Sequence, residues 1–322
     1  MILACHSQLA VPHPPHIVRY FRPIEASYGD LHEDEPFGRL SADIARLIRW
    51  HIYPWDVSVD AERAAKEAPI RDCMGLYAAY MEQYREAHGR ARWVCKSTFM
   101  VEELAALTAL FPAPKVIWLV RDPRDVAVSS RRSVFSTFHP YFTAKLWTKQ
   151  QDAALAVCDG PPLRTPPWMK LLYFEDLLRE PEAELRRLCA FIDEPFEASM
   201  LNYFESKEAR RSAALSRSWE NTAAPIRTDR VGQYHAGLSR EEQQMVEALA
   251  SPTMLRLGYP LTFPVDQLSE IRWSPGQIRE FAAQDRAERQ NVERRSMRED
   301  RNHLRRRRRD VLIRWLRRRY GR

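Results

Sequence analysis

The stretch that decides the fold reads Lys115-Val-Ile-Trp-Leu-Val-Arg-Asp-Pro-Arg-Asp-Val-Ala-Val-Ser129. Its apolar, β-branched beginning is typical of a strand that is buried on both faces in a parallel sheet. Asp122 suits a helix N-cap and Pro123 suits the first helical position, so we expect a helix to begin where the strand ends. The stretch therefore predicts a strand, a turn and a helix in direct succession.

The turn in this stretch brings together groups that bind anions. Arg121 is expected at the carboxyl end of the strand, and Ser129 almost two turns into the helix, on the face shared with Asp125 and Arg132. A guanidinium, a hydroxyl and a nearby helix start can together seat a phosphate group. The alternative is an ordinary strand, turn and helix whose arginine is only solvated, and this stretch alone leaves both interpretations open.

Strand and helix patterns alternate on both sides of this stretch. We expect strands at 93–95 and 168–174 and helices at 100–111, 142–157 and 182–192. A strand, a helix and a second strand over residues 93–120 make a βαβ unit, which implies a parallel sheet. The predicted fold class is therefore α/β.

The remaining segments are a mixture of helices and loops. Helices are expected over 1–9, 40–50 and 70–88, whereas the proline-interrupted residues 10–39 and the polar residues 202–240 are expected to be irregular. An irregular polar segment such as 202–240 suits a loop that closes over a ligand.

Composition narrows the class of protein. A chain of 322 residues with 45% hydrophobic residues can bury a large core. No apolar segment approaches the roughly 18 residues that span a bilayer, and the N-terminus lacks a signal-peptide pattern, so we expect a cytoplasmic protein. The five cysteines are scattered and the histidines show no ligand spacing, so neither a disulfide framework nor a metal site is expected.

The net charge of +7 resides in the C-terminal tail. Residues 283–322 carry 16 arginines and 6 acidic residues, or +10, which leaves −3 for the rest of the chain. Any anion site in the body must therefore come from local arrangement. We divide the chain into a domain of residues 1–265 and a charged helical extension of residues 266–322.

The tail supports three interpretations. Val311, Leu312, Trp315 and Leu316 form an apolar stripe among arginines, as in a helix that lies on an anionic membrane surface. The arginines of residues 283–322 are also able to neutralise nucleic-acid phosphates, but the aromatic interleaving of a single-strand groove is absent, so nucleic acid is the least favoured partner. A solvated helix without a partner is the third interpretation.

Several blocks of the chain match one known pattern. These blocks are Val120–Ser130, Phe174–Phe191, Trp219–Thr222 with Asp229–Tyr234, and Leu257–Pro260. Together they resemble the sulfotransferases that use 3′-phosphoadenosine-5′-phosphosulfate (PAPS), in particular bacterial members related to the tyrosylprotein and glycan enzymes. The resemblance extends over residues 1 to about 262.

This resemblance implies a fold and a reaction. The fold is a P-loop-NTPase-like three-layer arrangement around a central parallel sheet. The reaction transfers a sulfuryl group from PAPS to an acceptor hydroxyl or amine. Glycans, lipids, peptides and small alcohols are all compatible acceptors.

The resemblance also implies roles for individual residues. Arg121 and Ser129 match the pair that holds the 3′-phosphate of the co-substrate. Lys96 matches a lysine near the transferred sulfuryl group, although Lys96-Ser-Thr98 lacks the proline that follows this lysine in the family. Residues of the cofactor-closing segment are matched by Trp219, Asn221, Thr222 and Arg230.

Two departures from the family pattern stand out. The family's Pro-Arg-Ser-Gly-Thr-Thr loop, whose backbone N–H groups cradle the 5′-phosphosulfate, has no counterpart here, and Met1–Pro12 resembles the helix that follows it. We therefore expect the domain to be incomplete at its N-terminus in this sequence. The alternative is a degenerate protein without transferase activity that binds anions, membranes or nucleic acid through its tail.

The second departure concerns the general base. The usual glutamate position is occupied by Pro14, within Pro12-His-Pro-Pro-His16. His13 and His16 are the candidate bases, because an imidazole can take a hydroxyl proton near neutral pH. Simple packing in the proline-rich loop is the alternative for each, and Glu25 and Glu33 are possible substitutes.

Overall fold

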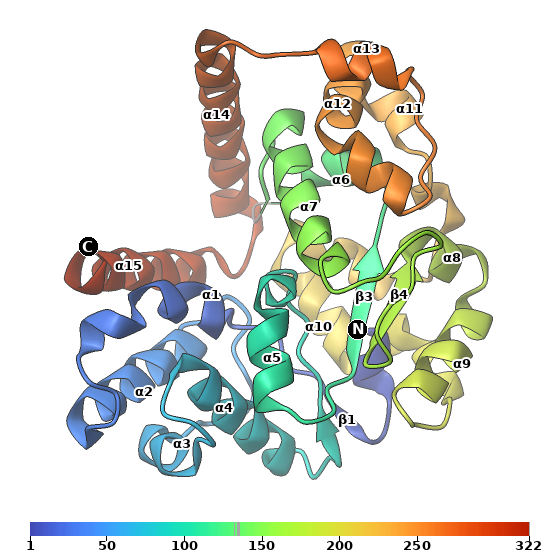
Figure 1. The fold of residues 1–322 in the computed structure, drawn as a ribbon. Helices are drawn as coiled ribbons and strands as arrows, with labels where there is room; N and C mark the ends of the chain where they lie inside the picture. Colours follow the sequence, from blue (N-terminus) through green and yellow to red (C-terminus); the bar gives the residue numbers. More distant parts are fainter. Residues whose placement is uncertain (132, 134–135, 322) are drawn as a thin grey trace. The chain divides into compact units, whose positions relative to one another are not determined.

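The computed structural model describes residues 1–131, 133 and 136–321 (Figure 1). The chain divides into two compact units. Unit 1 comprises Met1–Pro112, Glu197–Pro225 and Asp300–Arg322, and unit 2 comprises Ala113–Phe196 and Ile226–Glu299.

Unit 2 is built on a parallel pair of strands. β3 (Val116–Val120) pairs with β4 (Met169–Tyr173), with Val116 opposite Met169 and Val120 opposite Tyr173. The two strands lie side by side in Figure 1, and the connection between them runs through α6 (Pro123–Ser130) and α7 (Pro140–Leu155). Both predicted strands are confirmed, and their parallel pairing requires a long connection, which α6 and α7 provide.

The predicted helix start is also confirmed. The Asp122 carboxylate accepts a hydrogen bond from the backbone N–H of Arg124 at 2.8 Å, and Pro123 occupies the first turn of α6. The expectation that the strand is buried on both faces is wrong, because Leu119 is 51% exposed. Trp118 on the other face is buried, and its indole N–H donates to the Gln151 side chain of α7 at 2.8 Å.

Helices complete unit 2. They are α8 (Phe174–Arg179), α9 (Pro181–Phe191), α11 (Tyr234–Gly237), α12 (Arg240–Arg256), α13 (Val265–Glu270) and α14 (Pro275–Glu299). A small apolar core joins α6, α7 and α12 through Ala127, Val128, Ala144 and Val246. This packing holds α6, and with it the predicted anion ligands, against the rest of the unit.

Unit 1 contains a second parallel pair. β1 (Leu9–Ala10) pairs with β2 (Arg92–Trp93), and the backbone N–H of Val94 donates to the Ala10 carbonyl at 2.8 Å. The expected helix over residues 1–9 is wrong beyond a 3₁₀ helix at Ile2–Cys5, because Leu9 and Ala10 are buried in this pairing. β2 pairs with β1 and not with β3, so the expected βαβ unit over 93–120 does not form one sheet within the described residues.

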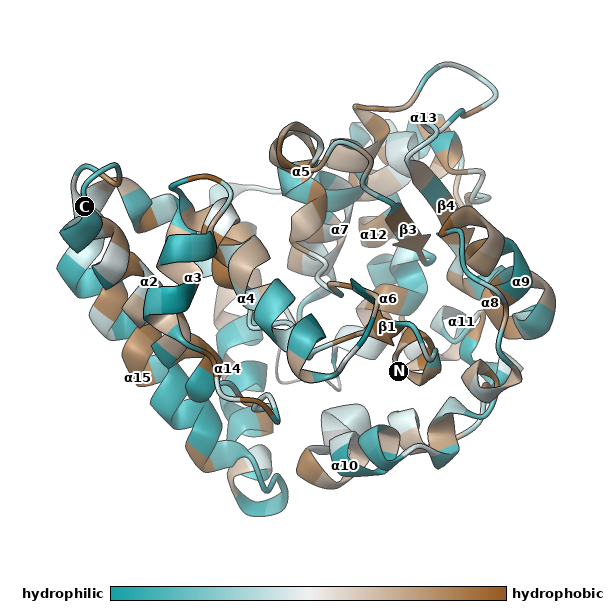
Figure 2. Cartoon of the chain, turned by 90° about the horizontal axis from the view of Figure 1, so that it is seen from below, coloured by the Kyte–Doolittle hydropathy of each residue, from teal (hydrophilic) through white to brown (hydrophobic). Residues whose placement is uncertain are grey.

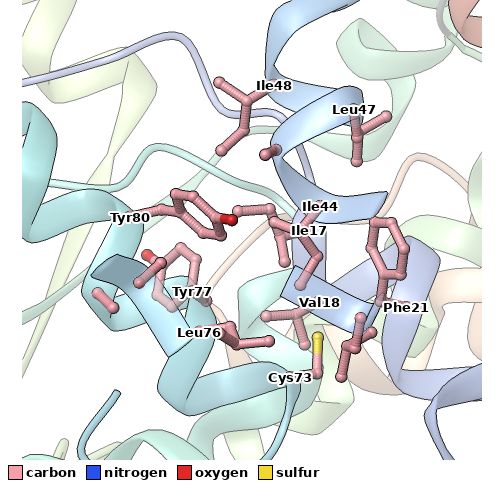
Figure 3. Packing of buried hydrophobic residues seen from close by; sticks show 14 of the residues in the cluster. Ile17, Val18, Phe21, Ile44, Leu47, Ile48, Cys73, Leu76, Tyr77 and Tyr80 are labelled. Atoms are coloured by element: carbon pink, nitrogen blue, oxygen red, sulfur yellow. The ribbon is translucent and has the colours of Figure 1, made fainter. Parts of the chain in front are cut away.

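A helical layer forms the core of unit 1. Its helices are α1 (Ile17–Phe21), α2 (Asp34–Arg49), α3 (Ala61–Glu67), α4 (Cys73–Ala87), α5 (Leu104–Leu110), α10 (Lys207–Leu215) and α15 (His303–Tyr320). Ile17 and Phe21 of α1 pack with Ile44 of α2 and Leu76 of α4 (Figure 3). The expectation of an irregular segment over 10–39 is therefore wrong for residues 17–28 and 34–39, which are helical, and holds for residues 11–16 and 29–33.

The C-terminal helix α15 contributes to this core. Leu312 and Leu316 are buried in the same cluster, and the Tyr320 ring stacks on Tyr28 with 4.0 Å between ring centroids. The interpretation of all four residues as one membrane-surface stripe is therefore wrong for Leu312 and Leu316, whereas Val311 and Trp315 are exposed. The division of the chain at residue 265 stays a prediction. No helix among the described residues has both the length and the apolar character needed to cross a bilayer.

Candidate functional site

The residues that the sequence singled out are distributed over both units. Unit 2 carries Arg121, Ser129 and Arg230. Unit 1 carries His13, His16, Lys96, Trp219, Asn221 and Thr222. The candidate residues of unit 2 and those of unit 1 are therefore described separately.

Arg121 is held in place at the carboxyl end of β3. Its Nη2 donates to the backbone carbonyl of Arg230 at 2.7 Å and lies 3.7 Å from the Asp125 carboxylate. The guanidinium also lies over the ring of Phe174, 4.7 Å from the centroid. The Trp147 indole N–H donates to the Arg121 carbonyl at 2.9 Å, so backbone and side chain are both positioned.

The guanidinium of Arg121 retains unused donor capacity. Its Nε is buried and has no hydrogen-bond partner within the described part of the chain. Burial lowers the pKa of Arg121, whereas the carboxylates of Asp125 and Glu175 oppose this effect. An unsatisfied buried donor on a cation is destabilising, and binding an anion relieves this penalty.

Ser129 is exposed near the C-terminal end of α6. Its exposure leaves the hydroxyl accessible to a ligand. Asp125, one turn earlier, is 1% exposed. The expected neighbour Arg132 lies outside the described residues.

Asp125, which lies one helical turn before Ser129 on α6, makes contacts that the sequence did not predict. One carboxylate oxygen accepts from the backbone N–H of Gly232 at 2.9 Å, and the other accepts from that of Tyr234 at 3.0 Å. Asp125 thus ties the segment that follows Arg230 to α6. The signal in the sequence was its position one turn before Ser129.

The second arginine of the turn belongs to a buried network. Arg124 is 2% exposed and forms ion pairs with Asp122 at 2.6 Å and with Glu247 at 2.7 Å. Glu247 also accepts from the backbone N–H of Thr262 at 2.9 Å. Arg124 therefore stabilises the turn through these two ion pairs.

A cavity of about 530 Å³ lies beside this turn in unit 2. Its lining includes Asp125, Glu175, Gly232 and Tyr259. Tyr259 donates to the Glu175 carboxylate at 3.1 Å, and Glu175 accepts from the backbone N–H of Asp122 at 2.9 Å. The sequence blocks around 120–130, 174–191, 229–234 and 257–260 therefore meet within this one unit.

In unit 1, His16 lines a cavity of about 230 Å³ together with Ser97 and Phe99. Its Nδ1 lies 3.1 Å from the Ser97 hydroxyl oxygen, and the edge of its ring contacts Phe99. Its backbone is left-handed, with φ of 56°, where the chain enters α1. This conformation is uncommon for a residue other than glycine and aims the imidazole at Ser97.

His13 lies in an aromatic cluster. Its ring stacks on Tyr53 with centroids 4.0 Å apart and lies 5.1 Å from the Trp219 ring. Burial lowers the pKa of His13 to about 2, and the cation of Lys96 adds to this effect. Burial likewise lowers the pKa of His16 to about 3, reinforced by His51 and Arg19. Both imidazoles are therefore neutral at neutral pH.

Lys96 follows β2 and keeps access to solvent, although the protein around it lowers the pKa of its ammonium group by desolvation. Thr222 donates to the carbonyl of Trp219 at 2.7 Å, and the Asn221 carbonyl accepts from Ala224 at 3.3 Å. These contacts hold the 3₁₀ helix at Arg217–Ala223 together.

The substitute bases occupy different environments. The Glu25 carboxylate accepts from the backbone N–H of Cys73 at 3.0 Å, and burial raises its pKa. Glu33 is exposed at the start of α2. Glu25 therefore serves as a helix cap in unit 1.

Known proteins resemble this chain over most of its length. The family model described as "Sulfotransferase family" matches residues 1–198. The chain is 24% identical to protein-tyrosine sulfotransferase A of Caenorhabditis elegans over 188 residues, which cover 56% of this chain and 49% of that protein. It is also 24% identical to protein-tyrosine sulfotransferase 1 of Danio rerio over 244 residues, covering 71% and 66% of the two chains.

A third relative is carbohydrate sulfotransferase 1 of Homo sapiens, with 28% identity over 160 residues that cover 39% of this chain and 38% of that protein. The chain thus spans between about two fifths and two thirds of the length of these relatives. Among solved structures, the sulfotransferase domain from the curacin biosynthetic pathway is similar in fold. Its TM-score is 0.50 at 19% identity, with 81% of this chain and 92% of that domain covered.

The match to the family extends over more than half of the chain, and the fold of unit 2 presents the expected arginine at the end of a parallel strand. The chain belongs to the sulfotransferase family.

Proposed function

We propose that this protein transfers a sulfuryl group from PAPS to the hydroxyl or amine of an acceptor. Family membership supports this reaction, and the relatives are named for protein tyrosine and for carbohydrate. The observation that carries the proposal is Arg121, a positioned cation with an unsatisfied buried Nε at the carboxyl end of β3. Ligands in open α/β folds bind at this end of the strands.

In this proposal, Arg121 and Ser129 bind the 3′-phosphate of the co-substrate. Arg230 belongs to the segment that Asp125 ties to α6, so this segment is preorganised beside Arg121. Trp219, Asn221 and Thr222 are assigned to cofactor binding through the family pattern. Preorganisation matters because a fixed donor needs little reordering when the anion arrives.

Lys96 is proposed to stabilise the charge on the sulfuryl oxygens during transfer. The acceptor oxygen attacks sulfur, the bond from sulfur to the 5′-phosphate oxygen breaks, and adenosine 3′,5′-bisphosphate leaves. His16 is favoured as the base over His13, because it lines a cavity while His13 is stacked on Tyr53. The imidazole is neutral at neutral pH and takes the acceptor proton as sulfur is attacked.

The acceptor is proposed to carry a hydroxyl group, as in tyrosine or a sugar. Peptides, glycans, lipids and small alcohols remain the candidate classes, and a cytoplasmic location stays a prediction. Transfer of labelled sulfate into a lysate of the source cell would identify the product.

Binding of adenosine 3′,5′-bisphosphate, measured by titration calorimetry, tests the phosphate assignment. Arg121→Ala is expected to weaken binding about 10- to 100-fold, because a hydrogen bond to a charged group contributes about 1.5–3 kcal/mol. Ser129→Ala should weaken it about 2- to 10-fold, as expected for a neutral donor. Arg186→Ala serves as control, since Arg186 is 58% exposed on α9. Affinity that is unchanged in both site variants would show that the phosphate assignment is incorrect.

The base is tested by transfer kinetics with a phenolic acceptor. His16→Asn should lower kcat by about 10²- to 10⁴-fold, the range of general base catalysis, while His13→Asn should act mainly through packing. Equal losses in both variants would contradict the preference for His16.

A further inference from the structure

Helix α15 has an inner face that belongs to the core of unit 1. Leu312, Ile313 and Leu316 are 3%, 8% and 1% exposed within the large apolar cluster. Arg306 and Arg309 pair locally with Asp300 at 3.7 Å and Asp310 at 2.8 Å. The inner face is thus satisfied by contacts within the chain.

The outer face of the same helix carries exposed apolar side chains. Leu304 is 58% exposed, Val311 is 54% exposed and Trp315 is 39% exposed. At about 100° per residue, these three positions lie within about 40° of one another around the helix axis. They therefore form one continuous stripe, which we call the outer stripe. Figure 2 shows α15 as a helix in which hydrophobic and hydrophilic segments alternate.

Exposed arginines flank the outer stripe on both sides. Arg308 lies about 40° to one side of Leu304, and Arg318 about 40° to the other. Arg307 and Arg314 extend the second side, and all four side chains are exposed. An apolar stripe bordered by cations is typical of helices that lie in the interface of an anionic bilayer.

We propose that α15 binds the surface of an anionic lipid bilayer through the outer stripe and its flanking arginines. The arginines attract anionic headgroups while Leu304, Val311 and Trp315 enter the boundary between headgroups and acyl chains. The inner face stays packed on unit 1, so binding requires no unfolding.

Other occupants of this face fit less well. A nucleic acid would use the arginines and leave the apolar stripe without a partner. A second copy of the chain would bring two arginine-rich faces together, which like-charge repulsion disfavours. The combination of stripe and cations therefore favours a membrane.

Vesicle flotation of the full chain tests the proposal. The probes are vesicles of pure phosphatidylcholine and vesicles with about one third phosphatidylserine, whose surface attracts each basic residue enough for about a fivefold effect on affinity. The chain should bind only the anionic vesicles, and binding should weaken as the salt concentration rises.

Paired substitutions separate the two features. Arg308→Gln with Arg318→Gln should weaken binding about 25-fold, and Leu304→Ser with Val311→Ser should weaken it at least about tenfold. Both pairs alter exposed side chains, so thermal unfolding should be unchanged. Arg286→Gln with Arg298→Gln on α14 removes the same charge from exposed positions and should leave binding intact.

Four outcomes would overturn the proposal. Equal binding to both vesicle types, or an equal loss in the α14 control, would remove the specific role of α15. Retention of duplex DNA that depends on the arginines, with vesicle binding indifferent to Leu304 and Val311, would assign the face to nucleic acid. A dimer in solution that disappears with the Leu304 and Val311 substitutions would assign the stripe to a second copy.

Discussion

Replacing Arg124 by methionine removes the cation from the buried network at the turn between β3 and α6. The side chain is 2% exposed and contacts the carboxylates of Asp122 at 2.6 Å and Glu247 at 2.7 Å. The Glu247 side chain is fully buried. The substitution therefore leaves two carboxylates without their cation, and one of them, Glu247, is shielded from solvent.

The expected loss is about 3–5 kcal/mol in the free energy of unfolding, the range for removing one partner of a buried ion pair. A surface pair in the same unit provides the scale. Arg186 pairs with Glu182 at 2.7 Å, but both side chains are more than half exposed. Arg186→Met should therefore change the free energy of unfolding by about 0–1 kcal/mol.

Urea unfolding followed by circular dichroism measures both variants. A further substitution, Glu247→Gln in the Arg124→Met background, should recover part of the loss. It removes a buried charge and keeps an oxygen that accepts from the backbone N–H of Thr262. A cost for Arg124→Met within about 1 kcal/mol of that for Arg186→Met would refute the reasoning, since buried and surface pairs would then contribute alike.

Three further predictions address the C-terminal helix α15, the buried histidines of unit 1, and the loop of residues 230–234 that Asp125 holds. Leu316 is buried, so Leu316→Ala should lower the free energy of unfolding by about 2–5 kcal/mol. Val311 is exposed, so Val311→Ala should change it by less than about 0.5 kcal/mol. Similar urea midpoints for the two variants would contradict the packing of α15 on the core of unit 1. Burial lowers the pKa values of His13 and His16 in the folded chain, so the unfolded chain takes up protons first as the pH falls below 6.5. The contribution of the two neutral imidazoles to the free energy of unfolding is therefore fully present above pH 6.5 and is lost toward pH 3. Between pH 7 and 5.5 each imidazole should lower the free energy of unfolding by about 1 kcal/mol, measured by urea unfolding. If the variant His13→Gln with His16→Gln shows the same pH dependence of stability as the parent, the two histidines are not its origin. Asp125→Asn keeps only one acceptor oxygen for the loop and should weaken adenosine 3′,5′-bisphosphate binding about tenfold by calorimetry, whereas parental affinity would show that the tie to α6 has no effect on the ligand.

Local signals in the sequence predicted the central part of unit 2 well. The apolar run before Arg121 and the Asp122-Pro123 pair act within a few residues, so their consequences for β3 and α6 do not depend on distant parts of the chain. The pattern also identified the phosphate ligands as a hypothesis. It left Arg124 without a role, because its partner Glu247 lies 123 residues further along the chain.

The errors arose where long-range packing overrides local pattern. Residues 10–39 contain enough prolines to predict a loop, yet Ile17 and Phe21 fold into α1 because α2 and α4 cover them. Leu9 and Ala10 form β1 because β2, more than 80 residues later, supplies the hydrogen-bond partners. Propensity is a weak prior in such places, since the stabilising contacts come from elsewhere in the chain.

The sequence by itself determined the strand, cap and helix at 115–130, the family resemblance and the concentration of arginine in the tail, because each depends on neighbouring residues or on composition. Only the tertiary structure decided which arginine of the turn is buried in ion pairs and which keeps a free donor, since Glu247 and Arg230 reach them from more than 100 residues away. It also decided that Leu312 and Leu316 point into the core while Val311 and Trp315 point out. A helical pattern shows that a stripe exists, but the direction in which it faces depends on which surface of the fold lies beside it.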